Sequence, residues 1–454
     1  MLAAAAALLV ASGCAVHEPR TEVHPPMPAA WSEPTGAAIA TPLNRAWWRS
    51  YGSAQLEPLL DEALAGSGDL RIAAQRVRQA DIALQLAGAS LLPGMSASVG
   101  SSTSRSEGSG TLRKSTSASV NVSYEVDMWG RIAAGAQGAE ASLAASRYDF
   151  ETARITLVAS VAITYFQLLA TRERVTIALQ NLATAERVLR IVEARARFGV
   201  ATPLELAQQT TTVLQQRTAV LPLEVQARQT ASALALLLGR TPQGFRAGEG
   251  ESLLQLTTPP VTPGLPSSLL QRRPDLAAAE ARLAAADADV AAARAALLPS
   301  ISLSAGGGTG SAQLFSLTTG GGSISLGLSL AQTLFDGGRK QLQIESSRAQ
   351  RQALVDGYGN AVRSALKEVE DALSNSDRNT RQERTQQEVV AQAQRTLGLA
   401  ELRYREGVET LTTVLDAQRT LFSAQDTLAQ FRLARLTSSV DLYRVLAGGW
   451  EPAT

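Results

Sequence analysis

The chain has 454 residues, enough for two or three ordinary domains or for one extended repetitive architecture. Its 42 basic and 41 acidic residues give a net charge of +1, so it lacks the basic excess typical of nucleic-acid-binding proteins. Both histidines, His17 and His24, and the single cysteine, Cys14, lie close to the N-terminus. The rest of the chain therefore offers no imidazole or thiol for catalysis or soft-metal binding, and we predict no catalytic residues, no metal site and no cofactor.

A short apolar run, MLAAAAALLVASGCAV, opens the sequence. It is too short to span a bilayer and is typical of a signal peptide, predicted here as residues 1–13. Its ending, ASGC, is similar to a bacterial lipoprotein processing site, in which Cys14 becomes the lipidated first residue of the mature protein. The alternative is an ordinary cleaved signal in which Cys14 has no role. No other stretch approaches 18 consecutive apolar residues, so no membrane-spanning helix is predicted.

An internal repeat organises the rest of the sequence. The stretch GDLRIAAQRVRQADIALQLAGASLLP at 68–93 matches PDLAAAEARLAAADADVAAARAALLP at 274–299 without a gap. Further on, RARFGVATPLEL at 195–206 matches RYREGVETLTTV at 403–414. Each copy has a helix ending at Leu-Leu-Pro, a Ser/Gly-rich region, a very long helix, a glycine turn and a returning helix. The sequence therefore indicates two copies of one structural plan.

These signals set the predicted domain boundaries. The first copy takes residues 68–240 and the second 269–448, with a Pro/Gly-rich linker at 241–268 between them. A lipid-anchored N-terminal segment at 14–67 precedes the copies, and a short tail at 449–454 follows them. Within the copies we predict strands at about 94–128 and 300–335, and helical hairpins at about 131–239 and 339–447.

The Ser/Gly-rich regions alternate small polar with apolar residues. In SISLGLSL (323–330) and SASVNVSYEV (117–126), every second residue is apolar, and MSASV (95–99) and SISLSA (300–305) begin the partner strands. Low complexity is also compatible with disorder, but strict alternation is a strand signal. One apolar and one polar face fit a strand with lipid on one side and water on the other.

Four such strands are too few to close a membrane barrel. An open sheet edge in hydrocarbon would leave unpaired backbone groups at a cost of several kcal/mol each. Known single-chain barrels begin at about eight strands, so at least two chains must contribute. Periodicity alone is compatible with two, three or four.

Two proline-free runs, 131–197 and 339–405, predict very long helices. Each would extend about 100 Å at 1.5 Å per residue, too long for a compact globule of this size. The returning helix of the second copy carries apolar residues at positions 411, 414/415, 421/422 and 428, the spacing of a coiled-coil seam. The sequence therefore predicts long antiparallel helix pairs attached to a four-stranded sheet.

Taken together, these motifs resemble the outer membrane factors of tripartite efflux systems, the TolC-like and OprM-like lipoproteins of the NodT class. The resemblance covers nearly the whole mature chain. Its most specific segments lie at 46–64 (AWWRSYGSAQLEPLLDEAL), 269–305 (LLQRRPDLAAAEARLAAADADVAAARAALLPSISLSA), 333–339 (TLFDGGR), 403–425 (RYREGVETLTTVLDAQRTLFSAQ) and 441–450 (DLYRVLAGGW).

The resemblance implies a mixed α and β membrane protein that forms a homotrimer. Twelve strands, four per chain, would form an outer-membrane β-barrel, continued by a periplasmic α-helical barrel of coiled-coil hairpins with an equatorial domain. The implied partners are a periplasmic adaptor protein, an inner-membrane pump of the resistance-nodulation-division class and outer membrane lipid. The implied function is a passive conduit for drugs or other small toxic compounds, anchored by its lipid in the outer membrane and extending into the periplasm.

The two glycine turns are candidate docking points for the adaptor. Helix lengths place Gly199 and Gly407 far from the predicted strands, and glycine permits the positive φ that a helix C-terminus often needs. Each is followed by a valine, Val200 and Val408, and the four residues form the predicted adaptor-contact tip. The alternative is that both glycines merely end their helices.

A charged pair, Asp416 and Arg419, follows the second turn, whereas the first copy has uncharged residues at both positions. Together with Thr412 and Ser423 the pair is spaced i, i+4, i+7 and i+11, which makes a polar stripe distinct from the apolar seam. Three carboxylates converging near a trimer axis would repel unless a base or a cation compensates them. On a solitary helix, by contrast, the pair would be a solvated one worth about 0.3–0.5 kcal/mol.

We predict that Asp416 rings a periplasmic constriction and that Arg419 and basic or polar partners help hold the second hairpin closed. The resemblance agrees, because the family places an acidic ring from this LDAQR segment at its closed tip. Close relatives can carry an apolar residue where this chain has Thr412, so a second, hydrophobic ring is expected to be weaker here. Tyr404 is included in the gate as a brace for the returning helix, with ordinary packing as the alternative.

Two other functions are compatible with parts of the sequence. A TolC-like duct for type I secretion of proteins or peptides would share the architecture. A lipid-tethered structural coiled-coil protein would keep the helices and leave the Ser/Gly regions disordered, which the alternating strands argue against. A carboxylate-dependent hydrolase is disfavoured, because no convergent acid pair is recognisable.

Overall fold

The computed structural model describes residues 21, 26–32, 46–105, 112–247, 249–261, 263–317, 321–448 and 450. The predicted signal peptide, Cys14 and all of the tail at 449–454 except residue 450 lie outside these residues. The chain forms two compact units. Unit 1 comprises 1–25, 75–148 and 276–361, and unit 2 comprises 26–74, 149–275 and 362–454.

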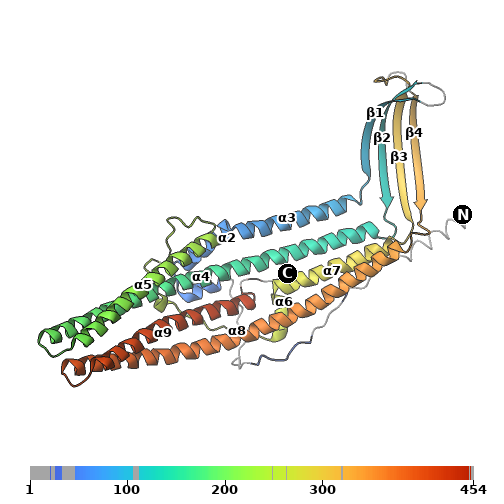
Figure 1. Cartoon of the computed structure of the whole chain (residues 1–454). Helices are drawn as coiled ribbons and strands as arrows, with labels where there is room; N and C mark the ends of the chain where they lie inside the picture. The colour runs from blue at the N-terminus through green and yellow to red at the C-terminus, as the bar shows by residue number, and fades with distance from the viewer. Residues whose placement is uncertain are drawn as a thin grey trace. The chain divides into compact units, whose positions relative to one another are not determined.

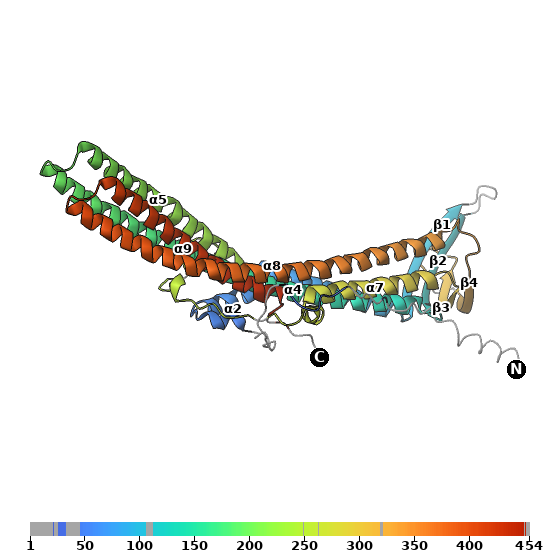
Figure 2. The same cartoon turned by 90° about the horizontal axis from the view of Figure 1, so that it is seen from below.

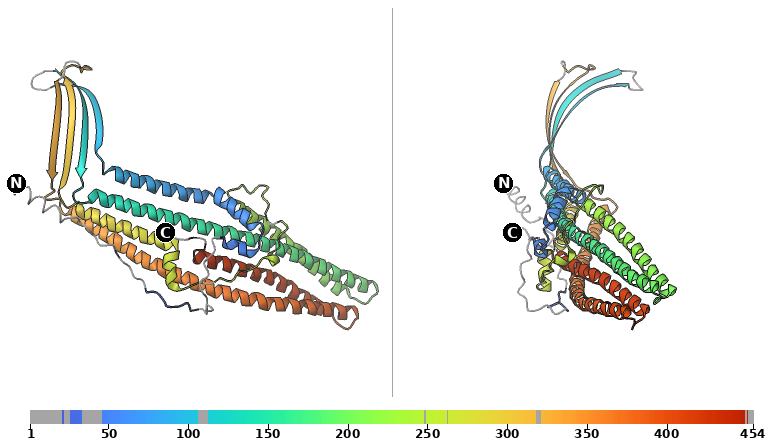
Figure 3. Two further views of the ribbon diagram at one scale, coloured as in Figure 1. Left: turned by 180° about the vertical axis from the view of Figure 1, so that it is seen from behind. Right: turned by 90° about the vertical axis from the view of Figure 1, so that its left-hand side faces the viewer.

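Unit 1 contains a four-stranded antiparallel sheet with the strands in chain order (Figure 1). The strands lie side by side and the sheet curves along its length (Figure 3). The ordered ladder shows that the Ser/Gly-rich regions form strands, as their alternation predicted. The strands are β1 (Gly94–Arg105), β2 (Leu112–Val126), β3 (Ser300–Ser311) and β4 (Gly321–Ala331).

The register of the sheet places apolar residues opposite apolar residues. Val122 of β2 pairs with Ala305 of β3, which in turn pairs with Leu326 of β4. On the other face serines meet across strands, as in the 2.9 Å hydrogen bond between the hydroxyls of Ser98 and Ser119. The apolar face is uncovered, and Leu326 is 86% exposed. A one-residue slip would exchange the two faces, so the alternation fixes the register.

A 22-residue helix precedes each pair of strands in the chain, and a 67-residue helix follows it. Asp127 begins the first long helix by accepting hydrogen bonds from the backbone N–H groups of Ile132 and Ala133, at 3.1 and 2.7 Å. Such a cap satisfies N–H groups that have no partner inside the helix. The helices are α3 (Gly68–Ala89), α4 (Arg131–Arg197), α7 (Pro274–Ala295) and α8 (Arg339–Arg405).

In unit 2, the ends of α4 and α8 form hairpins with returning helices of 35 residues each (Figure 2). The bounds of both long helices agree with the proline-free runs in the sequence. Corresponding long and returning helices of the two copies begin 208 residues apart. Besides the two returning helices, α5 and α9, unit 2 contains only short further elements among its described residues. The returning helices are α5 (Pro203–Leu237) and α9 (Leu411–Val445), and the short elements are η1 (Trp47–Tyr51), α2 (Leu56–Gly66), η2 (Leu253–Gln255), η3 (Pro266–Ser268) and α6 (Leu269–Arg272).

The largest hydrophobic core of unit 2 surrounds the middle of α4. Tyr165 and Phe166 are fully buried there, with Tyr51 and Leu56 from the N-terminal elements packed in the same cluster. Among the described helices, α4 has one 18-residue stretch that is long and apolar enough to cross a membrane, and half of that stretch is buried inside the structure. Because its apolar side chains build this core, we interpret the stretch as a core helix.

The predicted linker at 241–268 is attached to this core by Glu251. The carboxylate accepts hydrogen bonds from the Ser53 hydroxyl at 2.8 Å, the Ala54 N–H at 3.0 Å and the Tyr165 hydroxyl. The pKa of Tyr165 is raised above its ordinary value, mainly by burial and in addition by the neighbouring Glu251 carboxylate. The tyrosine therefore stays protonated and keeps donating to Glu251.

A close approach of two backbones makes Gly66 a sensitive position. An added Cβ at Gly66 would lie 2.4 Å from the carbonyl oxygen of Leu238, whereas nothing lies within 4 Å of a Cβ at Gly68. We expect Gly66→Ala to destabilise unit 2 by about 1–3 kcal/mol through overpacking and Gly68→Ala to be neutral or slightly stabilising. Urea titration of both variants checks this, and equal midpoints would contradict it.

Candidate functional site at the hairpin turns

Both hairpin turns of unit 2 are built on a glycine with positive φ, 71° at Gly199 and 78° at Gly407. In each turn the following valine N–H bonds back to a carbonyl five residues earlier, Val200 to Arg195 at 2.9 Å and Val408 to Arg403 at 3.1 Å. This is the Schellman ending, in which glycine avoids the strain of a side chain. Val200 and Val408 are 60% and 64% exposed, so each turn presents an apolar side chain to its surroundings.

The predicted gate residues of α9 lie on one exposed helix face. Asp416 Oδ1 accepts a hydrogen bond from Arg419 Nη2 at 2.8 Å, and the two side chains are 60% and 81% exposed. Thr412 and Ser423 are exposed on the same face. The predicted seam is separate and buried, with Leu411 and Val414 in the core. Within one chain, an exposed pair of this kind contributes at most about 1 kcal/mol.

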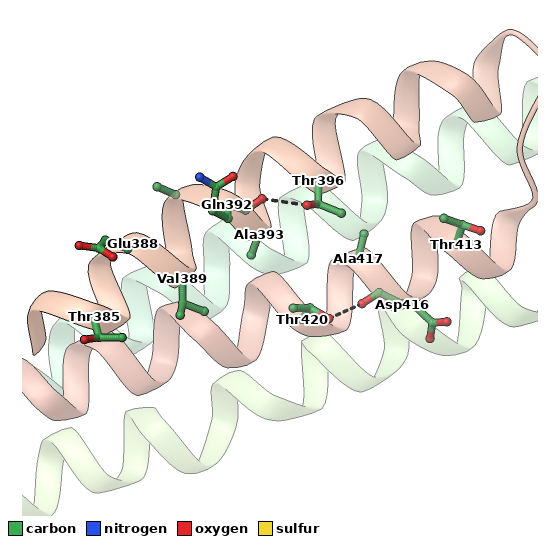
Figure 4. Close-up of a pocket in the computed structure, with 11 residues that line it drawn as sticks. Thr385, Glu388, Val389, Gln392, Ala393, Thr396, Thr413, Asp416, Ala417 and Thr420 are labelled. Atoms are coloured by element: carbon green, nitrogen blue, oxygen red, sulfur yellow. Dashed lines mark hydrogen bonds between the residues drawn. The ribbon is translucent and has the colours of Figure 1, made fainter. Parts of the chain in front are cut away.

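Asp416 also lines a cavity of about 870 Å³ between α8 and α9 (Figure 4). Glu388 supplies a second carboxylate, and no basic side chain belongs to the described lining. The wall is therefore acidic and hydroxyl-rich, which favours cations over anions near it. No group of three or more His, Cys, Asp or Glu suitable for a metal ion occurs among the residues that the structure describes. The polar lining comprises Thr385, Glu388, Gln392, Thr396, Thr413, Asp416 and Thr420.

The structure places Tyr404 away from the exposed stripe, in a contact between the two hairpins. Tyr404 is 2% exposed and packs in the same cluster as Leu411 of the returning helix. The hydroxyl donates to Glu205 Oε1 on α5 at 3.3 Å, and the Arg195 guanidinium of α4 lies 4.6 Å from the ring centroid. Arg195 also donates to the Tyr404 carbonyl at 2.6 Å. Tyr404 thus joins the second hairpin to the first.

Sequence reasoning missed the residues of the first hairpin that complete this contact. Glu205 was recognisable, because Thr202 and Glu205 have the spacing of a capping box and form one in the structure. Arg195 carried no signal, since nothing in the sequence relates it to Tyr404. Gln418 was also missed: it is fully buried in α9, and its amide atoms have no hydrogen-bond partner among the described residues.

Acid is expected to loosen the contact between the hairpins. Hydrogen bonding to the backbone N–H of Thr202, followed by its hydroxyl, Tyr404 and the charge of Arg195, lowers the pKa of Glu205 below its ordinary value of 4.5. A carboxylate with a lowered pKa contributes stability above its unfolded pKa and loses it as the pH falls through the folded value. Hydrogen exchange of residues 195–206, corrected for intrinsic pH dependence, should therefore accelerate below pH 4.5.

Glu205→Gln should show faster exchange of that segment already at pH 7 and little further change in acid. Glu193→Gln is the matched control, since Glu193 is exposed on α4 and outside the contact. Equal exchange in wild type and Glu205→Gln at both pH values would contradict the prediction.

Comparison with known proteins identifies the protein family that this sequence matches. The family model described as outer membrane efflux protein matches residues 59–240 and 265–448. The pyoverdine export outer membrane protein OpmQ of Pseudomonas aeruginosa is 43% identical over 418 residues, covering 90% of this chain and 88% of that protein. The probable efflux pump outer membrane protein TtgC of Pseudomonas putida is 32% identical over 471 residues, covering 100% and 96%.

Solved structures agree with the sequence comparisons. The outer-membrane channel OprN superposes with a TM-score of 0.86 at 26% identity, covering 96% of this chain and 100% of that one. The open state of the MtrE outer membrane channel of Neisseria gonorrhoeae gives the same score and identity, covering 96% and 98%. The similarity therefore extends over both units of the chain.

Proposed function

We propose that this chain, which belongs to the outer membrane efflux protein family, is the outer-membrane channel of a tripartite efflux system. Members of this family are transport proteins, so the chain is not an enzyme. The observation that carries the proposal is the sheet of unit 1, whose apolar face is uncovered and whose edge strands have no partner in the described chain. A bilayer would cover the apolar face, and further copies of the chain would pair with the open edges, which supports the proposal.

The proposed assembly is a homotrimer. The outer strands β1 and β4, of 12 and 11 residues, are similar in length, so β4 of one copy matches β1 of the next. Pairing them would close a barrel of twelve strands and satisfy every edge. Ile324 and Leu328 of β4, 90% and 72% exposed, would face lipid, while the serines would face water. Lipidation of Cys14 would add an anchor in the same membrane.

The proposed gate is the exposed stripe of α9. In a trimer with the second hairpins around the axis, three copies of Asp416 would form an acidic ring, and each Arg419 would hold its carboxylate at the observed 2.8 Å. Thr412 would add a polar ring in place of an apolar one. Tyr404 would keep each second hairpin against the first through Glu205 and Arg195.

The proposed adaptor contact is the pair of turns around Gly199 and Gly407. Their support is the exposure of Val200, Val408 and Phe198, the last 85% exposed, at otherwise polar helix ends. The proposed partners are a periplasmic adaptor and an inner-membrane pump of the resistance-nodulation-division class. The names of the relatives, a pyoverdine exporter and an efflux pump component, support small organic compounds as the exported class.

Native mass spectrometry and planar-bilayer recording of the detergent-purified chain test the proposal together. We expect three chains per particle and an ion-conducting channel. A monomer, or a particle without conductance, would overturn it. Deletion of the gene should then increase susceptibility to a panel of small toxic compounds without affecting secretion of proteins. The opposite pattern would favour a type I secretion duct.

A further inference from the structure

A second cavity of unit 2 lies between α4 and α8, has a volume of about 540 Å³ and is lined mainly by arginines. Arg187, Arg190 and Arg195 come from α4 and Arg405 from α8, while Glu401 is the only acid in the described lining. The whole chain has a net charge of +1. Four guanidinium groups around one carboxylate are therefore a local excess of positive charge that the proposed gate does not use.

The charge of this four-arginine cavity is only partly compensated. Arg187 pairs with Glu401 at 2.9 Å, and Arg195 donates to backbone carbonyls of α8 at 2.6 and 3.2 Å. Arg190 and Arg405 are exposed, and neither guanidinium has an ion pair or hydrogen bond to another described residue. Each presents a planar fork of donors that matches a carboxylate in bidentate geometry. Two such forks are thus open to an anionic partner.

The shape of the lining indicates what kind of anion fits. Arg187 and Arg195 are eight residues apart, or about 12 Å along the helix. Between them lie Ile191 and Ala194, half-buried, so the floor of the cavity is apolar. A single phosphate would contact only part of this strip and leave the floor unused. A helix with carboxylates a turn or two apart and one apolar residue between them would cover all of it.

The position of the cavity points to the same partner. An added Cβ at Gly407 would lie 4.0 Å from both terminal nitrogens of Arg195, so the cavity adjoins the second hairpin turn. That turn, with its exposed Val408, belongs to the proposed adaptor contact. The apolar turn and the basic cavity therefore form one continuous surface.

We infer that the four-arginine cavity is a docking site for an acidic helical segment of the periplasmic adaptor. Arg190 and Arg405 bind its carboxylates, and Ile191 receives its apolar side chain. Arginine rather than lysine suits this role, because the planar fork fixes the orientation of the partner. The inference rests on the proposed function, since it names how the adaptor of that efflux system is recognised.

The test measures binding of the purified cognate adaptor to the full-length chain in nanodiscs, at low and high salt. Arg190→Glu/Arg405→Glu should weaken binding at least about tenfold at low salt and flatten its salt dependence. The neutral pair Arg190→Gln/Arg405→Gln should give an intermediate loss. The matched control is Arg384→Glu, an exposed arginine of α8 outside the cavity, which should bind within about twofold of wild type. Native mass spectrometry verifies that each variant keeps its assembly.

Each outcome is decisive. If the adaptor binds wild type and the double charge reversal equally well, the docking site is wrong and the proposed function stands. If the adaptor does not bind wild type, the proposed function itself fails. If inorganic phosphate at millimolar concentration raises the unfolding temperature of wild type but not of the double variant, and adaptor binding is unchanged, the cavity holds a small anion and the assignment to the adaptor is overturned.

Discussion

Replacing Glu383 by alanine is expected to lower the free energy of unfolding by up to about 3–5 kcal/mol, because it leaves two largely desolvated guanidinium groups, 13% and 31% exposed, without their counter-ion. Glu383 of α8 is 2% exposed. Its two oxygens accept one hydrogen bond each from Arg432 and Arg435 of α9, both at 3.0 Å. Arg432 also donates to the carbonyl of Leu256 in the linker. The carboxylate therefore connects both helices of the second hairpin to the linker.

The magnitude follows from desolvation rather than from the attraction of the charges alone. Removing one member of a buried ion group is costly because the remaining charge has lost both water and partner. Urea titration of the purified protein measures the loss. Glu388→Ala is the control, since Glu388 is exposed on the same helix and should change stability by less than about 0.5 kcal/mol. Equal losses in the two variants would show that Glu383 is not effectively buried.

The burial of this ion group could not be predicted from the sequence. Glu383 lies in a stretch rich in charged residues, which looks like a solvated helix face, and Arg432 and Arg435 lie in the mainly apolar stretch LAQFRLARL (428–436). Nothing in the periodicity distinguishes the carboxylate at 383 from the exposed one at 388. Burial here depends on how α8, α9 and the linker pack, and that contact joins residues about 50 to 180 positions apart. Charge patterns alone do not encode such a contact.

Local sequence signals were sufficient to predict most of the helices and strands. The long helices α4 and α8 begin and end where their proline-free runs do, since nothing inside a run interrupts helical hydrogen bonding and a glycine ends each one. The strands follow their alternation, and the register pairs equal faces. The exposed stripe of α9 also follows from spacing. The contact of Tyr404 with Arg195 and Glu205 does not, because it joins residues about 200 positions apart.

Replacing Asp416 by alanine is expected to raise single-channel conductance in planar bilayers and to reduce its block by polyvalent cations. In the proposed trimer the substitution removes three carboxylates from the axis and leaves three Arg419 side chains without their partner at 2.8 Å. Each pair lies within one helix and is present in open and closed hairpins alike, so the shift comes instead from three uncompensated Arg419 guanidinium groups near the axis, whose mutual repulsion would disfavour the closed state. The lost carboxylates would at the same time remove the binding determinant for cations.

The repeat supplies the control for this experiment. Gln208 occupies the position in the first hairpin that corresponds to Asp416 and is likewise exposed. Gln208→Ala therefore changes the same helix position without changing charge, and should leave conductance and cation block as in wild type. If Asp416→Ala also matched wild type in both properties, the charged pair would be an ordinary solvated one. If both variants opened the channel, the constriction would depend on hairpin packing rather than on the acidic ring.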